Sequence, residues 1–257
     1  MQIDLQGRVA IVTGAAHGIG RTICRTLAAV GARVWATDIL AAELDATVAA
    51  VTGAGGVCHA AVTNLTDAAA VAALIERVGG EEGRIDILVN SAGGVVGQVG
   101  RPVEEITDED WDTVVKANLY SSFYCIRAVA PVMKRQGGRI VNISSGAGRS
   151  VSLTGIQAYA SAKAGQLGLT RQMAHELGRW NITVNAIAPG FVRSNPTTER
   201  QWEALGDDGQ RRLVEAIALR RLGKPEDIAN GVLYFVSDLG AWVTGQTISI
   251  DGGRHMV

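Results

Sequence analysis

Short apolar, β-branched runs recur along the chain and alternate with segments whose apolar residues have helical spacing. The runs lie at 8–13, 32–38, 56–62, 85–90, 139–144, 182–186 and 247–250. Between them, apolar residues recur three and four apart, as in 19–30, which ends near Gly31, and in 71–78, which ends at Gly79 and Gly80. Strands alternating with helices form a parallel sheet, and right-handed crossovers place helices on both faces. The pattern predicts an α/β fold, a doubly wound (Rossmann) sheet of seven parallel strands.

No Pro- or Ser-rich linker, repeat or low-complexity tract divides the 257 residues, so we expect a single domain over 1–257. The segment 191–224 lacks a strand pattern and mixes Trp202 with charged residues and glycines. An insertion of this kind inside a compact domain is typically a lid or a binding loop. We expect 191–224, together with 94–101 and Phe191, to shape a substrate pocket.

Charge and cysteine content narrow the function classes. The 24 basic residues balance 25 acidic ones, which leaves no broad positive surface for nucleic acid or anionic lipid. Cys24, Cys58 and Cys125 are odd in number and far apart, and the four histidines lack metal-ligand spacing, so we expect buried thiols and no metal. The first residues do not resemble a signal peptide, and no stretch approaches the roughly 20 apolar residues that span a bilayer. We expect a cytoplasmic protein with no nucleic-acid or membrane partner.

A glycine-rich turn joins the first predicted strand to the first predicted helix, with the sequence Thr13-Gly14-Ala15-Ala16-His17-Gly18-Ile19-Gly20. Gly14 permits a tight turn, Gly18 permits close approach of a pyrophosphate, and Gly20 lets the helix pack on the sheet. Phosphate is favoured at the helix N-terminus, where N–H groups are unpaired. The turn therefore predicts a dinucleotide site. His17 either adds partial positive charge beside the phosphate or is an ordinary loop residue.

The second predicted strand ends in Asp38, 18 residues after Gly20. A carboxylate there accepts a hydrogen bond from a ribose 2′-hydroxyl, whereas a 2′-phosphate would meet like charge. Ile39 and Leu40 supply no cation to offset that charge. The cofactor predicted is NAD. The alternatives are NADP, which requires a cation from elsewhere, and a simple helix-capping role for Asp38.

Tyr159 and Lys163 are four residues apart in a predicted helix that runs to about Gly178, so they share a face. A nearby ammonium favours phenolate and brings the tyrosine pKa, about 10 in water, toward neutrality. The run at 139–144 leads to Ser145 at the carboxyl edge of the sheet, where a hydroxyl can hydrogen-bond a carbonyl oxygen as charge builds on it. These residues predict hydride transfer between NAD(H) and a secondary alcohol or ketone, with Tyr159 as general acid/base. Serine hydrolysis is disfavoured because a Gly-x-Ser-x-Gly elbow is absent.

From about Gly7 to Gly253, the combined motifs resemble the short-chain dehydrogenase/reductase family in its form of about 250 residues. Thr13-Gly14-x-x-x-Gly18-Ile19-Gly20 matches its cofactor loop, Tyr159-x-x-x-Lys163 its catalytic pair, and Ser145 its catalytic serine. Asn90-Ser91-Ala92-Gly93 is similar to the family's Asn-Asn-Ala-Gly. The resemblance implies that Asn118 holds a water of a proton relay from Lys163 to solvent, and that Lys163 also holds nicotinamide ribose hydroxyls.

The resemblance also implies which residues contact the cofactor. Asn64 and Leu65 stand where the family's Asp-Val contacts adenine. Pro189, Gly190, Val192 and Ser194 border the nicotinamide, although threonine is more usual than Ser194. The remaining expected cofactor residues are Gly14, His17, Gly18, Ile19, Gly20, Asp38, Ile39, Asn90, Ala92, Gly93, Tyr159 and Lys163.

The resemblance further implies a homotetramer, assembled through the helices near 108–134 and 157–178, with a homodimer as the alternative. Two other functions stay open on the sequence. One is an NADP-dependent ketoreductase acting on 3-oxoacyl groups carried by acyl carrier protein, against which Asp38 counts. The other is a dinucleotide-binding scaffold without catalysis.

Overall fold

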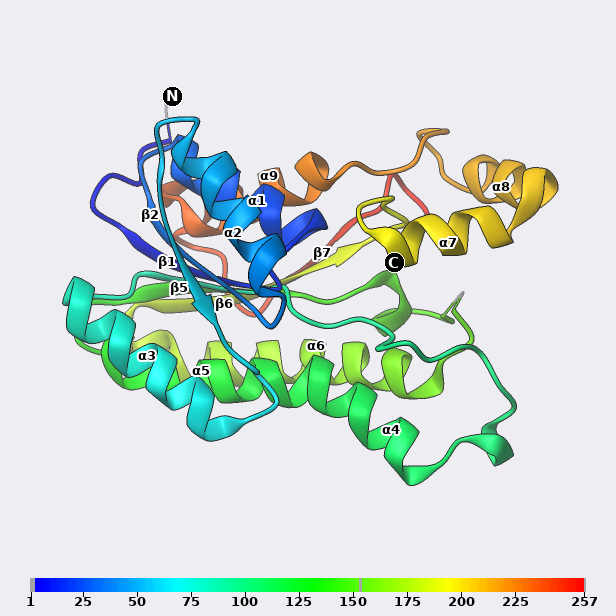
Figure 1. The fold of residues 1–257 in the computed structure, drawn as a ribbon, viewed down its shortest axis with the longest axis horizontal. Coiled ribbons are helices and arrows are strands. Elements are labelled where there is room, and N and C mark those ends of the chain that lie inside the picture. Colours follow the sequence, from blue (N-terminus) through cyan, green and yellow to red (C-terminus); the bar gives the residue numbers. More distant parts are fainter. Residues whose placement is uncertain (1–2, 153, 257) are drawn as a thin grey trace.

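The computed structural model describes residues 3–152 and 154–256 (Figure 1). Its strands are β1 (Val9–Thr13), β2 (Arg33–Asp38), β3 (Val57–Val62), β4 (Ile87–Asn90), β5 (Gly138–Ile143), β6 (Ile182–Pro189) and β7 (Thr247–Ile250). They form one seven-stranded sheet in the order β3-β2-β1-β4-β5-β6-β7, and every neighbouring pair is parallel. The predicted doubly wound sheet is confirmed, and its strand order reverses between β1 and β4.

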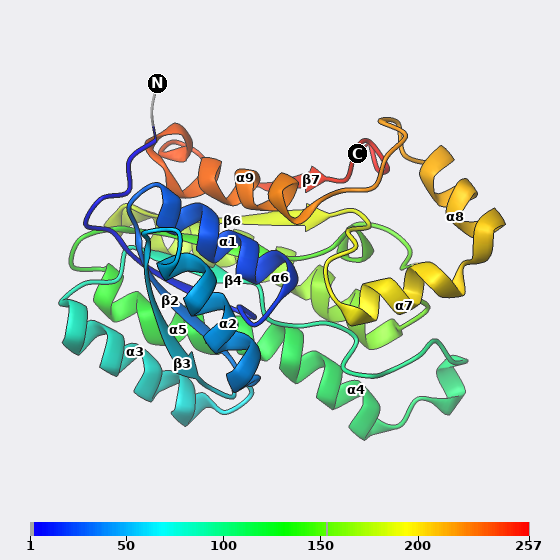
Figure 2. The ribbon, with the colours of Figure 1, turned by 45° about the horizontal axis from the view of Figure 1, so that its top comes forward.

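Helices cover both faces of the sheet (Figures 1 and 2). They are α1 (Gly18–Ala29), α2 (Ala41–Thr52), α3 (Ala68–Glu82), α4 (Asp108–Val115), α5 (Ser121–Met133), α6 (Gln157–Leu177), α7 (Pro196–Ala204), α8 (Gly206–Glu215) and α9 (Pro225–Val236). Because successive strand side chains point to opposite faces, Val12 packs with Leu27 and Phe235 under α1 and α9, while Ile11 packs with Leu74 and Ile126 under α3 and α5. The two apolar layers hold the sheet between them.

The helix after β3 differs from its prediction at its carboxyl end. It continues through Gly79 and Gly80 to Glu82 and ends at Gly83, which has φ +72°. A glycine inside a helix costs only about 1 kcal/mol relative to alanine, so packing on the sheet overrides it. The helix ends where Gly83 adopts a left-handed backbone conformation. The prediction that it ends at Gly79 and Gly80 is therefore wrong.

The predicted long helix at 108–134 is divided in two. α4 begins with a capping box between Thr107 and Asp110, and a π-helical turn at Lys116–Tyr120 separates it from α5. Such turns put an extra residue into the helix and are common at functional sites. Asn118 lies in this turn and is fully buried.

The segment 191–224 forms α7 and α8, which extend beyond the same end of the sheet as α4 (Figures 1 and 2). An isolated parallel bridge between Val192 and Gly223 closes the base of the segment. Asn195 begins α7 by accepting hydrogen bonds from the N–H groups of Thr197 and Thr198. The segment is thus an ordered helical pair fixed at both of its ends.

Candidate functional site

Four of the predicted segments meet at the carboxyl edge of the sheet. The glycine turn follows β1, Asn90 ends β4, Ser145 follows β5, and Pro189 ends β6. Since β1, β4, β5 and β6 are consecutive parallel neighbours, their ends lie side by side. Loops diverge where the strand order reverses, and ligands of open α/β sheets bind there.

Three glycines of the turn make approaches that a side chain would prevent. Gly14 has φ +66°, and a Cβ on it would lie 2.8 Å from the backbone nitrogen of Ala92. Gly18 has φ +59°, and its Cβ would lie 2.9 Å from the carbonyl oxygen of Ser194. Gly20 packs directly on the carbonyl of Gly14. The turn therefore carries no side chains at these glycines, where its backbone lies close to the loop after β4 and the loop after β6.

The N-terminus of α1 opens on this turn. His17 is its N-cap residue, in extended conformation, and its side chain makes no capping hydrogen bond. Ile19 instead packs against the core under α1. The first turn of α1 contains no acidic residue, so no carboxylate in that turn offsets the partial positive charge of the helix end. The bare backbone and this charge fit the pyrophosphate of a dinucleotide.

Asp38 connects the end of β2 to the glycine turn. Its Oδ2 accepts a hydrogen bond from the N–H of Ala16 at 3.0 Å, and its Oδ1 accepts from the N–H groups of Ile39 at 2.7 Å and Leu40 at 3.2 Å. The carboxylate is partly buried and fixed on both oxygens. It does not cap α2, whose N-cap residue is Leu40. Its place beside the turn suits the acceptor for a ribose hydroxyl.

The cofactor residues expected after β2 and β3 differ in their exposure and in their hydrogen bonds. Ile39 is 64% exposed beyond β2, whereas Leu65 is buried. The Oδ1 of Asn64 accepts hydrogen bonds from the N–H of Thr66 at 3.1 Å and from its hydroxyl at 2.8 Å. The atom expected to accept from adenine is therefore engaged within its own turn. Asn64 shapes the loop after β3.

The loop after β4 is held by side chains from neighbouring strands. The Thr13 hydroxyl accepts from the N–H groups of Ser91 and Ala92, both at 2.9 Å. Asn90 is buried and donates through Nδ2 to Asn142 Oδ1 at 2.8 Å, while its own Oδ1 is buried without a partner among the described residues. The amide of Asn90 thus links the end of β4 to β5 beneath the loop, and its oxygen is enclosed.

Tyr159 and Lys163 lie on one face of α6, as their spacing predicts. The Nζ of Lys163 is 5.8 Å from the centre of the Tyr159 ring and donates to the carbonyl of Ile143 at 2.9 Å. Ser145 follows that residue by two positions, and its hydroxyl hydrogen-bonds the Tyr159 phenol. The side chain of Ser145 also caps the short helix at Gly146–Gly148. The structure thus brings together the three side chains singled out by the sequence.

Burial controls the pKa values of the tyrosine and the lysine. Removal from water raises the pKa of Tyr159 above its ordinary value, and the hydrogen bond with Ser145 acts in the opposite direction. Removal from water lowers the pKa of Lys163 to about 7. The expected depression of the tyrosine pKa by the lysine is therefore not seen. Desolvation disfavours the charged form of both groups.

Asn118 is tied to the protein through its side chain and its carbonyl. Its Nδ2 donates to the carbonyls of Gly94 and Val114, both at 2.8 Å, and its Oδ1 accepts from the N–H of Gly94 at 2.9 Å. Its carbonyl accepts from Gln166 Nε2 at 3.0 Å and from the Ser122 hydroxyl at 3.1 Å. These contacts pair both ends of the Asn118 amide and its backbone carbonyl within the protein. Asn118 here joins the loop after β4 to the π-helical turn.

The residues expected around the nicotinamide follow β6. Gly190 donates through its N–H to the carbonyl of Ile250 at 3.0 Å, which continues the sheet beyond Pro189. Val192 is buried and belongs to the core under α1. Ser194 lies against the glycine turn. The backbone of Ser194 thus approaches the glycine turn at Gly18.

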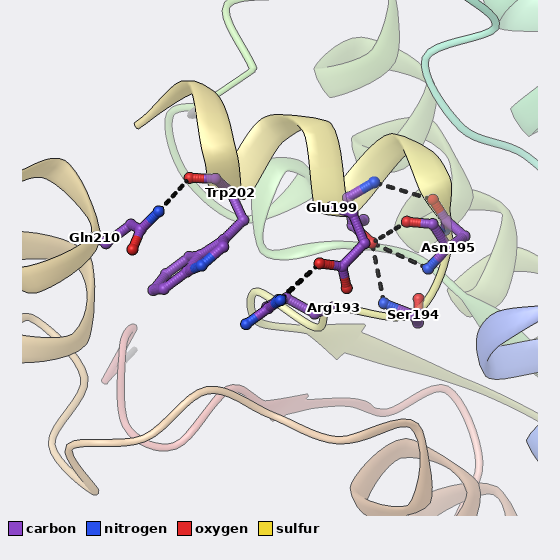
Figure 3. A network of polar contacts seen from close by, with 7 residues as sticks. Arg193, Ser194, Asn195, Glu199, Trp202 and Gln210 are labelled. Atoms are coloured by element: carbon purple, nitrogen blue, oxygen red, sulfur yellow. Dashed lines mark hydrogen bonds and ion pairs between the residues drawn. The ribbon is translucent and has the colours of Figure 1, made fainter. Parts of the chain in front are cut away.

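A network of polar and aromatic contacts fixes α7 to α8 (Figure 3). Arg193 forms an ion pair with Glu199 at 2.7 Å, and its guanidinium carbon lies 5.4 Å from the centre of the Trp202 ring. Trp202 is 6.1 Å from Phe191 between ring centres, and its carbonyl accepts from Gln210 at 2.9 Å. Phe191 and Trp202, both predicted pocket residues, are therefore neighbours.

Sequence reasoning missed Thr13 and Gln166. Thr13 is predicted as the first residue of the glycine turn, but the role of its hydroxyl, which fixes the loop after β4, is not. Gln166 is fully buried and accepts from Lys163 Nζ at 3.2 Å. Gln166 follows Lys163 by three residues and so lies on the same face of the helix. The spacing alone could therefore have predicted that the two side chains meet.

Three other expectations concern metals, membranes and thiols. Within 3–152 and 154–256, no group of three or more His, Cys, Asp or Glu side chains is arranged to hold a metal ion. No helix in the same ranges is long and apolar enough to cross a bilayer. Cys24, Cys58 and Cys125 are buried free thiols, as predicted, and burial raises the pKa of Cys58 to about 11 and that of Cys125 to about 12.

Comparison with known proteins agrees with this geometry. Residues 14–255 match the family described as enoyl-(acyl carrier protein) reductase. The 3-oxoacyl-[acyl-carrier-protein] reductase FabG of Escherichia coli (strain K12) is 37% identical over 99% of this chain and 100% of its own length, and that of Thermotoga maritima is 40% identical over 97% and 98%.

Solved structures give the same result. A putative short-chain alcohol dehydrogenase from Sinorhizobium meliloti matches with a TM-score of 0.89 and 37% identity, over 98% of this chain and 97% of that one. A putative gluconate dehydrogenase from Agrobacterium tumefaciens matches with a TM-score of 0.92 and 31% identity, over 100% of both chains. With its sheet order, glycine turn and Tyr159/Lys163 pair, the chain belongs to the short-chain dehydrogenase/reductase family of oxidoreductases.

Proposed function

We propose that this oxidoreductase transfers hydride reversibly between NAD(H) and a secondary alcohol or ketone. The observation that carries the proposal is the convergence of Ser145, Tyr159 and Lys163 at the sheet edge that also holds the glycine turn. The nicotinamide, when bound, supplies or accepts the hydride. The protein positions the two reactants and handles one proton.

Each polar group of the site has a defined role in this proposal. In the reducing direction the Tyr159 phenol donates its proton to the carbonyl oxygen, and in the oxidising direction the phenolate takes the hydroxyl proton. The Ser145 hydroxyl hydrogen-bonds the same oxygen as negative charge develops. The Lys163 ammonium stabilises the phenolate and, by family resemblance, holds the nicotinamide ribose. Asn118 keeps the loop after β4 in place.

The preference for NAD follows from Asp38. Its carboxylate is fixed by three backbone N–H groups beside the glycine turn, where a 2′-phosphate would meet negative charge. A second candidate is reduction of a 3-oxoacyl group on acyl carrier protein with NADPH. The two FabG relatives at 37% and 40% identity favour that substrate, and Asp38 opposes that cofactor. A scaffold without catalysis is disfavoured because Ser145, Tyr159 and Lys163 are all present.

We propose that the single domain over 1–257 binds its substrate under residues 191–224 and works as a homotetramer in the cytoplasm. Large apolar side chains are exposed in two parts of the fold: Trp111, Tyr120 and Phe123 lie on α4, the π-helical turn and α5, and Trp242 and Ile248 lie in the loop before β7 and on β7. Two such regions suit an assembly with two kinds of contact, and a homodimer would cover only one. Free buried thiols agree with a reducing compartment.

The experiment is a panel of secondary alcohols and ketones, including a 3-oxoacyl thioester, assayed with NAD(H) and NADP(H). We expect turnover with NAD(H), and loss of nearly all turnover in Tyr159→Phe with NADH binding retained. Tyr120→Phe, an exposed tyrosine on the π-helical turn, is the matched control. Normal turnover in Tyr159→Phe would remove Tyr159 from the chemistry. Preference for NADPH would favour the second candidate.

A further inference from the structure

A buried glutamine lies directly beneath the proposed catalytic pair. Gln166 is fully buried on α6, and its Oε1 accepts a hydrogen bond from Lys163 Nζ at 3.2 Å. Its Nε2 donates to the carbonyl of Asn118 at 3.0 Å and to the Ser122 hydroxyl at 2.7 Å. The amide therefore bridges the lysine of one helix and the π-helical turn of another.

The partners of this amide leave it only one orientation. A flipped amide would point its NH₂ group at the ammonium and its oxygen at the Asn118 carbonyl, placing donor against donor and acceptor against acceptor. In this orientation both the oxygen and the NH₂ group of the Gln166 amide are hydrogen-bonded. A buried amide with an unpaired donor or acceptor is strongly unfavourable, so these contacts fix the side chain in place.

We propose that Gln166 is a positioning residue for the reaction: it holds the ammonium of Lys163 beside Tyr159 and ties it to the carbonyl of Asn118 in the π-helical turn. The inference rests on the proposed function for its catalytic meaning. The carbonyl of Ile143 and the Oε1 of Gln166 accept two of the three ammonium protons. The third N–H is left for a ligand in the site.

The hydrogen bond from Lys163 to Gln166 favours the charged form of the lysine because the groups that face the ammonium from the neighbouring elements are neutral. Tyr159, on the same helix, is the titratable side chain whose ring lies near the ammonium. From β5, the loop after β4 and the π-helical turn, the facing groups are neutral: the Ile143 carbonyl, the Gly93 backbone and the Asn118 amide. With no carboxylate among these groups, the two acceptors stabilise the protonated lysine, and burial already lowers its pKa to about 7.

The test measures the pKa of Lys163 directly, by NMR titration of lysine carrying ¹³C at Cε, with the signal assigned by Lys163→Met. In Gln166→Leu we expect the pKa to fall by about one unit, because a hydrogen bond to a charged group is lost. In Gln166→Glu, which restores an oxygen, we expect it to return to the native value or rise above it. Gln166→Met repeats the loss if the leucine variant does not fold.

Thr170→Val is the matched control. Thr170 is buried one turn further along α6, and its hydroxyl bonds Asn142 and the Gln166 carbonyl rather than Lys163. We expect this variant to lower stability and leave the Lys163 pKa unchanged. The same pKa in Gln166→Leu, Gln166→Met and Thr170→Val would overturn the proposal and make Gln166 a packing residue.

The titration needs no turnover, so it decides the role of Gln166 in holding Lys163 even if the proposed function fails on the substrate panel. Where turnover is present, a second measurement follows. The protonated lysine favours the Tyr159 phenolate, so a lower Lys163 pKa in Gln166→Leu should reduce the rate of alcohol oxidation near pH 7 relative to the rate at high pH. An unmoved profile would overturn the catalytic part of the inference.

Discussion

The carboxylate of Asp38 accepts a hydrogen bond from the backbone N–H of Ala16 at 3.0 Å. This contact fixes the end of β2 against the glycine turn, so the acid proposed to select the ribose and the backbone proposed to receive the pyrophosphate are joined directly. The other carboxylate oxygen is held by the N–H groups of Ile39 and Leu40. In the proposed function, cofactor choice and loop shape therefore depend on the same side chain.

Asp38→Ala removes both the ribose acceptor and the like charge facing a 2′-phosphate. We expect the ratio of kcat/KM for NAD to kcat/KM for NADP to fall by about 10- to 100-fold, since hydrogen bonds to charged groups are worth about 1.5–3 kcal/mol. Asp45→Asn, an exposed acid on α2, is the control and should leave the ratio unchanged. An unchanged ratio in Asp38→Ala would assign cofactor choice to other residues.

The rate should depend on pH in opposite ways for the two directions. Burial raises the pKa of Tyr159, and oxidation needs the phenolate, so oxidation rises with pH until it passes that raised pKa. Reduction needs the phenol, so it falls over the same range. Initial rates over about pH 6 to 11 measure both limbs.

Ser145→Ala tests the cause of this profile. The hydrogen bond from Ser145 lowers the Tyr159 pKa, so its loss should move the oxidation limb to higher pH as well as reduce kcat. A lower kcat with an unmoved limb would show that Ser145 acts on the substrate oxygen alone.

Gly18→Ala introduces a Cβ that would lie 2.9 Å from the Ser194 carbonyl, at a residue with φ +59°. A left-handed conformation costs a non-glycine residue about 1–2 kcal/mol, so urea unfolding should show at least that loss of stability. Fluorescence titration should show weaker NADH binding. Gly80→Ala, inside α3 with no heavy atom within 4 Å of the new Cβ, should leave binding intact and stabilise the protein. Equal effects of the two substitutions would contradict this account.

Trp242 is 99% exposed in the loop before β7. A bare indole is unfavourable in water, so we expect a second subunit to cover it. Trp242→Glu should convert the proposed tetramer to smaller species in sedimentation velocity, while Val57→Glu, on the edge strand β3, should not. A monomer in the native protein would contradict the proposed assembly.

The sheet was predictable because each strand is a contiguous β-branched run closed by a polar residue or glycine. The face shared by Tyr159 and Lys163 was predictable because helical spacing depends only on sequence separation. The end of α3 was not, since a glycine within a helix and a glycine that ends it differ in φ rather than in residue type. The π-helical turn at Asn118 was not, because it arises from tertiary contacts with Gly94 and Gln166.

The pKa values were predictable only in part. A sequence places an ammonium near a phenol but does not give the depth at which both are buried, and here burial raises the pKa of Tyr159 and lowers that of Lys163. The hydrogen bonds of Asn64 with Thr66 were not predictable for a similar reason, since they depend on the turn that the loop adopts.

The approach of Ser194 to Gly18 places the residues that lead into α7 beside the loop expected to hold pyrophosphate. We expect a bound dinucleotide to draw these residues toward the glycine turn and to narrow the pocket expected under 191–224. By thermodynamic reciprocity, each ligand then raises the affinity of the other. Titration should therefore give a lower Kd for NADH in the presence of the second ligand, by the same factor by which NADH lowers the Kd of that ligand.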